Sequence, residues 1–378
     1  MKAVFAIDSF KGSLSSMEAG NAAAEGFLRA FPSGTATVRP LADGGEGTVD
    51  SLVAGLGGEM AEAEVSGPLG GRRRAKYGLL PDGTTAVMEM AEASGITLVP
   101  RDRLDPWHAT TLGVGQMVLD AIRRGRRRFL MGIGGSATND CGAGFLQGLG
   151  FRLLDGEGNP VAPGALALQS FDRLEIPADL AALLPELSFK VACDVANPLC
   201  GPKGASAVFG PQKGAKPSDI PKLDALLARF AELCAKGEFI KTPGAGAAGG
   251  LGFALKAFMG AELLPGAELV IAETRLEEAV RDADVVVTGE GRLDEQTVMG
   301  KAPAAVARLA KRHGKRVVAF AGCVTDGATA CNASGIDAFF PILRGVCSLD
   351  EALDKSRAAA NLAATSEQVF RLLASTRP

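Results

Sequence analysis

Five short apolar runs, each ending at a glycine or an acidic residue, constrain the fold more than any other feature of this sequence. They occupy residues 2–8, 128–135, 189–194, 283–291 and 316–322. An apolar run without polar alternation is typical of a strand that is buried on both faces of a parallel sheet. Helical patterns lie between these runs, for example at 16–31 and 303–313. The sequence therefore predicts an α/β fold.

The chain is long enough for about two domains. Its middle, residues 69–265, is less regular and richer in proline and glycine turns than the two ends. We therefore predict one domain built from residues 1–68 and 266–378, with a mixed α/β domain inserted at 69–265. The run at 128–135 fits either domain. In parallel sheets ligands bind beyond the carboxyl ends of the strands. The residues at those ends are Asp8, Gly134, Asp194, Gly289 and Gly322.

Composition excludes several classes of function. The formal charge is −3 and aromatic residues make up 5% of the chain, so nucleic acid is not an expected partner. No apolar run is long enough to cross a membrane, and the N-terminus does not fit a signal peptide. The seven cysteines form no C-x-x-C pair, which indicates reduced thiols and a cytoplasmic protein. Two histidines are too few for a histidine metal cluster.

Two glycine-rich loops carry candidate binding groups near the strand ends. In the loop at 43–48, glycines flank Asp43 and Glu46, whose carboxylates can approach Mg²⁺ or a substrate hydroxyl; an acidic turn that caps a helix explains the same pattern. The loop at 134–140 follows a strand with glycines and hydroxyls, and we expect it to begin a helix whose free N–H groups attract an anion. Helix capping alone is the alternative for this loop.

Further candidates follow other strands. Asp194 ends a strand with Asn197 three residues on, and could orient a nucleophilic hydroxyl or be only a solvated strand end. The loop at 201–215 carries Lys213, which could lie over phosphates or on the surface. The run at 289–297 combines the carboxylates of Glu290 and Asp294 with Arg292, and Lys301 follows it. Such a set suits a metal–phosphate environment, whereas a solvated, salt-bridged turn is the alternative. The turn after residue 8 adds Lys11 and several hydroxyls as a further anion site.

The sequence contains no G-x-x-x-x-G-K-[ST] motif, so a standard P-loop is excluded. One G-x-G-x-x-G occurs at 244–249, but it follows Thr242-Pro243 rather than a clear strand. A flexible loop that opens a helix is therefore more plausible than a dinucleotide-binding loop. A loop whose amides close over a ligand is intermediate in plausibility between these two interpretations.

Taken in order, these motifs resemble the type I glycerate kinase family. The matching segments begin at Asp8 (DSFKGS), Ala42 (ADGGEGT), Gly132 (GIGGSATND), Cys193 (CDVANPL), Phe209 (FGPQKGA), Pro243 (PGAGAAGGL) and Gly289 (GEGRLDEQT, followed by Lys301). They span nearly the whole chain. The resemblance implies a Rossmann-like domain made from both chain ends, an inserted domain, and an active site in the cleft. It also implies ATP-dependent phosphorylation of D-glycerate with Mg²⁺, in the metabolism of glyoxylate and sugar acids.

The residues and the resemblance together give a hypothesis for the mechanism. Asp194 is the first candidate for the group that orients or deprotonates the glycerate hydroxyl, Asp43 is the second, and Lys11 joins them as a catalytic candidate. Glu290 and Asp294 are the predicted Mg²⁺ ligands. Lys11, Lys213 and Lys301 are candidates for phosphate charge, and Arg292 or Ser136 for the glycerate carboxylate. The remaining predicted binding residues are Ser9, Gly44, Gly45, Glu46, Gly134, Gly135, Asn139, Asn197, Gly246 and Gln296.

Two positions depart from the family pattern. Cys141 and Gln116 stand where we expect glycine and glutamate, so no catalytic carboxylate is assigned at position 116. The resemblance favours the 2-hydroxyl as acceptor, with 3-phosphoglycerate as the alternative product. A protein that binds a small hydroxy acid without catalysis and a nicotinamide-dependent oxidoreductase are the competing functions. We expect the ligands to be D-glycerate and ATP, with no nucleic acid or membrane as a partner, and the protein to be a monomer or a homodimer.

Overall fold

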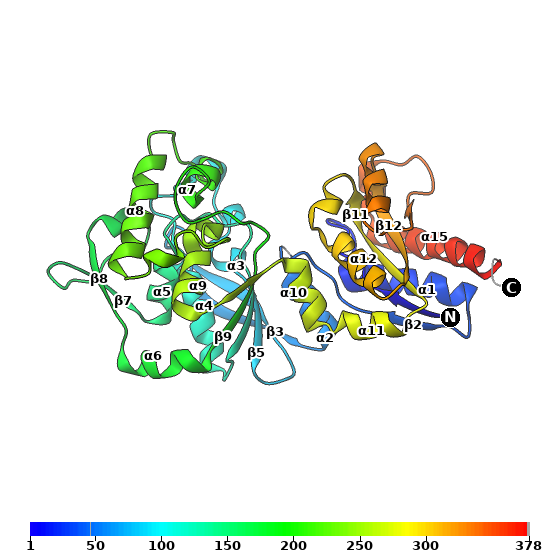
Figure 1. Ribbon diagram of the computed structural model, residues 1–378, viewed down its shortest axis with the longest axis horizontal. Helices are drawn as coiled ribbons and strands as arrows, with labels where there is room; N and C mark the ends of the chain where they lie inside the picture. Colours follow the sequence, from blue (N-terminus) through cyan, green and yellow to red (C-terminus); the bar gives the residue numbers. More distant parts are fainter. Residues whose placement is uncertain (46, 376–378) are drawn as a thin grey trace. The chain divides into compact units, whose positions relative to one another are not determined.

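The computed structural model describes residues 1–45 and 47–375, and the chain divides into two compact units (Figure 1). The first unit comprises residues 1–43, 50–57 and 265–378, and the second comprises 44–49 and 58–264. The sequence-based boundary at 68 lies about ten residues too late, because the strand at 59–66 pairs with the following strand of the second unit. Residues 44–49 also belong to the second unit rather than the first.

The first unit contains a five-stranded sheet in the order β13-β12-β11-β1-β2, in which every neighbouring pair is parallel. Both chain ends contribute strands, which confirms the predicted parallel-sheet domain. Its strands are β1 (Lys2–Phe5), β2 (Thr35–Val38), β11 (Val285–Leu293), β12 (Arg316–Val324) and β13 (Ala338–Pro341). Its helices are α1 (Ser16–Ala30), α10 (Gly266–Glu273), α11 (Leu276–Asp282), α12 (Ala302–Arg312), α13 (Ala330–Ala333), α14 (Leu349–Leu353) and α15 (Lys355–Ser375). Helix α2 (Thr48–Leu56) begins in the second unit and continues in the first.

Helices α1 and α15 lie side by side on one face of this sheet (Figure 1). Their contact is built around Phe27 and Phe370, whose ring centroids are 4.7 Å apart in an edge-to-face arrangement, and Phe5 of β1 lies beneath both. The sequence predicts one closing helix at 349–373, but the helix breaks at Asp354. Its carboxylate accepts hydrogen bonds from the Ser356 hydroxyl (2.6 Å) and the Arg357 N–H (2.8 Å), and so caps the start of α15.

The second unit contains a six-stranded sheet in the order β10-β9-β6-β5-β4-β3. The pairs β3–β4 and β4–β5 are antiparallel and the others are parallel, so the sheet is mixed, as predicted for the inserted domain. The strands of this unit are β3 (Glu59–Ser66), β4 (Arg72–Leu79), β5 (Thr85–Glu89), β6 (Arg128–Gly132), β9 (Ser188–Ala192) and β10 (Glu262–Leu264), with a separate hairpin of β7 (Arg152–Asp155) and β8 (Phe171–Glu175). Because β6 is a strand of this sheet, the run at 128–135 belongs to the second unit.

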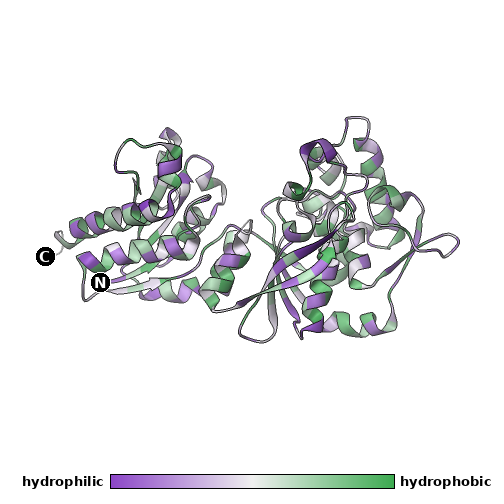
Figure 2. Cartoon of the chain, turned by 180° about the vertical axis from the view of Figure 1, so that it is seen from behind, coloured by the Kyte–Doolittle hydropathy of each residue, from purple (hydrophilic) through white to green (hydrophobic). Residues whose placement is uncertain are grey.

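The helices of the second unit are α3 (Ala91–Ser94), α4 (Leu112–Arg123), α5 (Ala143–Leu149), α6 (Ala178–Leu183), α7 (Ala205–Phe209), α8 (Ile220–Leu233) and α9 (Leu251–Met259). Purple and green bands alternate along many helices of both units, as expected for helices that bury one face (Figure 2). None of the helices within the described residues combines the length and the apolar character that a membrane crossing requires.

Candidate active site

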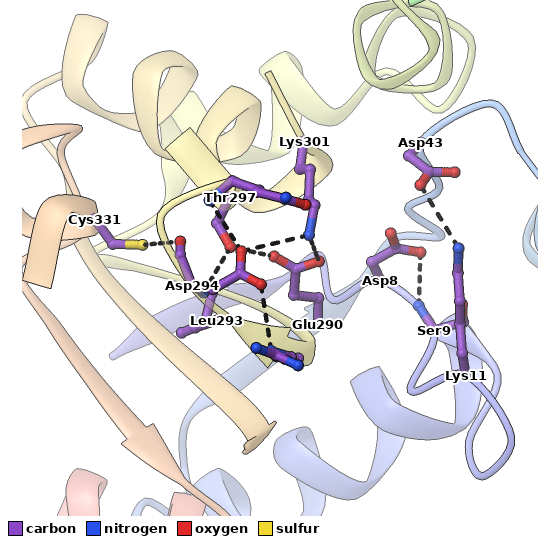
Figure 3. Close-up of polar contacts among 12 residues, drawn as sticks. Asp8, Ser9, Lys11, Asp43, Glu290, Leu293, Asp294, Thr297, Lys301 and Cys331 are labelled. Carbon is purple, nitrogen blue, oxygen red and sulfur yellow. Dashed lines mark hydrogen bonds and ion pairs between the residues drawn. The ribbon is translucent and has the colours of Figure 1, made fainter. Parts of the chain in front are cut away.

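In the first unit, acidic residues from both chain ends meet at the carboxyl edge of the sheet (Figure 3). Asp8 follows β1, and its backbone N–H donates to the carbonyl of Gly289 in β11 (2.9 Å). The Asp8 side chain is 7% exposed, and its carboxylate accepts a hydrogen bond from the N–H of Ser9 (2.7 Å). Burial, together with the negative charges of Asp43 and Glu290, raises the pKa of Asp8 to about 7.

A second group of charges surrounds Glu290 and Asp294 (Figure 3). The Thr297 hydroxyl donates to Glu290 Oε1 (2.7 Å) and accepts from the N–H of Asp294 (3.2 Å), which ties the two acids together. Lys301 Nζ lies 3.6 Å from Glu290 Oε2 and 3.8 Å from Asp294 Oδ1. Arg292 Nε lies 3.3 Å from Asp294 Oδ2. Burial raises the pKa of Glu290. The cluster thus holds two largely buried carboxylates and two more exposed cations.

Lys11, Asp43 and Gln296 stand at the edges of these groups. Lys11 Nζ lies 4.0 Å from Asp43 Oδ2, with both side chains substantially exposed. The backbone N–H of Gln296 donates to Asp294 Oδ1 (3.0 Å), while its side chain is exposed. The structure therefore brings together eight of the predicted residues in the first unit: Ser9, Lys11, Asp43, Glu290, Arg292, Asp294, Gln296 and Lys301.

The fit of Mg²⁺ to this cluster follows from its donor set. Within the described residues, no group of three or more His, Cys, Asp or Glu side chains is arranged to hold a metal ion. Mg²⁺ is, however, usually bound through one or two carboxylates together with substrate phosphates and water. Glu290 and Asp294 supply two carboxylates around one ammonium group. The pair fits Mg²⁺ that arrives with phosphates, and does not fit a site built from protein ligands alone.

Strand β11 lies two residues later than its sequence predicts. The apolar run covers 283–291, whereas β11 covers Val285–Leu293, because β12 continues beside it with Leu293 opposite Val324. Glu290 therefore lies inside the strand, three residues before its end. At Gly289 a Cβ atom would overlap the carbonyl oxygen of Phe320, so only glycine allows the two strands to pair this closely.

In the second unit, Ser136 and Lys213 form the centre of a buried polar group. Lys213 is 1% exposed, and its Nζ donates to Ser136 Oγ and to the carbonyl of Thr138, both at 2.7 Å. The prediction that Lys213 is exposed on a loop, over phosphates or at the surface, is therefore wrong. The expectation that a helix begins at Ser136 is also wrong, since α5 begins at Ala143.

Asp140 explains why residues 136–142 do not form a helix. This fully buried carboxylate accepts hydrogen bonds from the N–H and the hydroxyl of Thr111 (2.7 and 2.9 Å) and from the N–H groups of Gly142 and Gly144 (both 3.2 Å). Neighbouring Cys141 has φ of 57°, a backbone conformation that favours glycine. This conformation agrees with the glycine that the family pattern has at this position. Asn139 Nδ2 donates to Ser206 Oγ (2.9 Å), whereas its buried Oδ1 has no partner among the described residues.

Asp194 and Asn197 follow β9 as predicted, and the Asp194 side chain is exposed. Asn197 Nδ2 donates to the carbonyl of Lys203 (2.8 Å), and the Asn197 carbonyl accepts from the N–H of Gly246 (2.9 Å). Gly246 is buried, and a Cβ atom there would overlap the carbonyl oxygen of Pro198. The G-x-G-x-x-G segment follows turns rather than a strand, so it lacks the setting of a dinucleotide-binding loop. These glycines serve close packing.

The loop at 43–48 precedes α2 as expected. The Thr48 hydroxyl donates to the carbonyl of Gly45 (2.7 Å) at the start of this helix. Gly44 is buried with φ of 87°, a conformation that favours glycine. Glu46 lies outside the described residues. Gln116, the second departure from the family pattern, accepts a hydrogen bond from the N–H of Ser66 (2.7 Å) and so links α4 to β3.

Comparison with known proteins identifies the family. The profile described as "Glycerate kinase family" matches residues 3–374. This chain belongs to the glycerate kinase family. A glycerate kinase of Halalkalibacterium halodurans is 46% identical, over 96% of this chain and 97% of the relative. A glycerate 2-kinase of Escherichia coli K12 is 45% identical, over 97% and 98%. A crystal structure described as a glycerate kinase 2 of Salmonella typhimurium LT2 superposes with a TM-score of 0.91 at 44% identity, and covers 99% of this chain and 98% of that one.

The predicted glycerate kinase resemblance and the α/β fold are thus confirmed. Sequence reasoning left three buried residues out of the site: Asp8, Asp140 and Thr297. Asp8 carried a usable signal, because an acid that directly ends an apolar strand is placed at the ligand-binding edge of the sheet. The partners of Asp140 lie about thirty residues away in the sequence, and no local pattern reveals them.

Proposed function

We propose that this protein transfers the γ-phosphoryl group of ATP to the 2-hydroxyl of D-glycerate and releases ADP and 2-phosphoglycerate. Membership of the glycerate kinase family carries the proposal, and the E. coli relative named glycerate 2-kinase supports the choice of the 2-hydroxyl. Formation of 3-phosphoglycerate is the alternative. The product would return carbon from glyoxylate and sugar acids to glycolysis. The seven free cysteines support a cytoplasmic location.

The charged cluster of the first unit supports a role in holding phosphates. Phosphoryl transfer depends on positioning and on neutralising phosphate charge more than on covalent chemistry. Lys301, Lys11 and Arg292 are cations at the carboxyl edge of the sheet, where ligands of parallel sheets bind. Glu290 and Asp294 would hold Mg²⁺ together with the phosphates, and the bound ion would supply further positive charge there. The Thr297 hydroxyl holds the Glu290 carboxylate and accepts a hydrogen bond from the backbone N–H of Asp294.

The glycerate hydroxyl needs a group that orients it and accepts its proton. Asp194 is our first candidate, because its exposed carboxylate lies two residues beyond the end of β9. Asp43 is the second candidate, and its carboxylate faces the ammonium group of Lys11. Either side chain would act by aligning the attacking oxygen and receiving its proton during transfer.

An ADP-release assay with ATP, Mg²⁺ and D-glycerate tests the function, with the product passed to enolase. Direct conversion by enolase is the expected result and identifies 2-phosphoglycerate. Conversion only after phosphoglycerate mutase is added would keep the kinase and assign the 3-hydroxyl. If folded protein releases no glycerate-dependent ADP, the kinase proposal fails. Glycerate binding without turnover would then favour a binding protein.

A further inference from the structure

Lys213 of the second unit is a buried cation without a paired anion. Its Nζ donates to Ser136 Oγ and to the Thr138 carbonyl, both at 2.7 Å, and both acceptors are neutral. Within the described part of the chain, no carboxylate lies within 4.0 Å of this ammonium group. Burial lowers the pKa of Lys213 to about 7, and the more distant charge of Asp140 opposes this only partly. A buried, unpaired charge destabilises a fold, so its presence calls for a functional explanation.

The contacts of Ser136 show that its hydroxyl group can donate a hydrogen bond to a ligand. A charged lysine can only donate hydrogen bonds, so Ser136 Oγ is the acceptor in its contact with Lys213. The hydroxyl proton must then point to another acceptor. Among the described residues, none accepts a hydrogen bond from Ser136 Oγ. The hydroxyl is therefore free to donate to a ligand, with the positive charge of Lys213 directly behind it.

The turn before Ser136 adds two further donors. Gly134 and Gly135 are exposed, and their backbone N–H groups have no hydrogen-bond acceptor in the described ranges of the chain. A Cβ atom on Gly134 would meet nothing within 4 Å, so the space beside it is open. Gly135 has φ of 71°, which a residue with a side chain rarely adopts. Successive free N–H groups beside a hydroxyl and a cation form an anion-binding arrangement.

We propose that the turn formed by Gly134, Gly135 and Ser136 binds the carboxylate of D-glycerate, with Lys213 acting as a positioning residue behind Ser136. The inference rests on the proposed function and deepens it by assigning the substrate's carboxylate to these residues. The charge match favours a carboxylate over the nucleotide phosphates. One buried cation suits a single negative charge, whereas the several exposed cations of the first unit suit a polyphosphate.

The decisive variant is Lys213→Met, which keeps a long apolar side chain and removes the charge. We expect its KM for D-glycerate to rise on the order of tenfold to a hundredfold, as for a lost charge-assisted contact. Its KM for ATP should stay within about twofold. Because the variant also removes an unpaired buried charge, its melting temperature should stay equal or rise. A lysine with a merely structural role would give a lower melting temperature instead.

Three further measurements sharpen the test. Lys216→Met, an exposed lysine three residues on, is the matched control and should leave both KM values unchanged. Ser136→Ala should raise the KM for D-glycerate. Ser136→Thr keeps the hydroxyl, so its KM for D-glycerate should be close to that of the wild type. Wild-type protein should strongly prefer D-glycerate over glycerol, which lacks the carboxylate, and Lys213→Met should reduce this preference. Isothermal titration of D-glycerate reports binding independently of turnover.

The possible outcomes separate this inference from the proposed function. An unchanged KM for D-glycerate in folded Lys213→Met and Ser136→Ala overturns the inference. A rise in the KM for ATP alone also overturns it, because the anion would then be a phosphate. If Lys213→Met does not fold, Ser136→Ala and Ser136→Thr decide. If wild-type protein binds D-glycerate in the titration and Lys213→Met does not, yet no ADP forms, the proposed function fails while the carboxylate site stands.

Discussion

The backbone N–H of Asp8 donates to the carbonyl of Gly289 at 2.9 Å. This bond brings together two acids from distant parts of the chain, Asp8 and Glu290. The bond continues the parallel pairing of β1 with β11, in which Phe5 lies opposite Val287. It places Asp8 at the same sheet edge as Glu290, whose negative charge adds to the effect of burial in raising the pKa of Asp8. Keeping these acids charged in the folded state costs free energy of folding. The stability of the protein should therefore depend measurably on pH.

Asp8→Asn should stabilise the protein at pH 8 and leave its stability unchanged below about pH 4. Since the pKa of Asp8 is raised from 3.8 to about 7, the folded state binds more protons than the unfolded state between these values. The free energy of unfolding of the wild type therefore falls as pH rises through this window. The asparagine removes that loss, which is at most about 4 kcal/mol. Urea unfolding at pH 4 and pH 8 measures it, and an equal difference at both values would contradict the prediction.

Glu290→Gln and Asp294→Asn should each raise the Mg²⁺ concentration that gives half-maximal activity by about tenfold or more, because each removes one proposed ligand. Thermal stabilisation by ADP at increasing Mg²⁺ should shift in the same way, and this readout does not depend on turnover. Glu295→Gln, an exposed acid beside Asp294, is the control and should behave as the wild type. Unchanged Mg²⁺ dependence in both variants would remove the metal assignment.

Asp194→Asn should lower kcat by about 10²-fold to 10⁴-fold with small changes in both KM values, as expected when a positioned proton acceptor is lost. Steady-state kinetics on the folded variant check this, with circular dichroism as the folding control. Asp43→Asn is the matched comparison. A wild-type kcat in Asp194→Asn together with a large loss in Asp43→Asn would transfer the role to Asp43.

Gly289→Ala should destabilise the first unit by several kcal/mol, since the added methyl group overlaps the Phe320 carbonyl of the neighbouring strand. Gly345→Ala is the control, because a Cβ atom there meets nothing within 4 Å and the backbone conformation tolerates a side chain. Thermal unfolding of the two variants beside the wild type makes the comparison. Equal melting temperatures would show that the strands can separate at little cost.

Lys213→Met should change the pH dependence of stability as well as glycerate binding. The pKa of Lys213 is lowered from 10.5 to about 7, so the unfolded state binds more protons than the folded state in this interval. The wild type therefore gains stability from this residue as pH rises from 7 to 10.5, by at most about 5 kcal/mol. Chemical unfolding at pH 7 and pH 10 should show the variant's advantage shrinking at the higher pH. A constant difference would show that Lys213 is not buried as a cation.

Local sequence determined the fold class and the family of this protein. Apolar runs that end in glycine or acid, such as the one that became β1 and Asp8, mark buried parallel strands because strand burial leaves its pattern in consecutive residues. The order of seven short segments was enough to predict the family that comparison then confirmed. The residues around Glu290 were also found this way, since the acids and their cations lie within twelve positions of one another.

Tertiary structure decided the features whose partners are remote in sequence. The pairing of β3 with β4 moved the boundary between the units, and the pairing of β11 with β12 carried the strand two residues beyond its predicted end, to Leu293. Lys213 is buried against Ser136 across 77 positions of sequence, and no composition or spacing in its own segment distinguishes it from an exposed lysine. Burial and hydrogen bonding depend on which atoms the fold brings together, so only the folded chain determines the charge state and the partners of such residues.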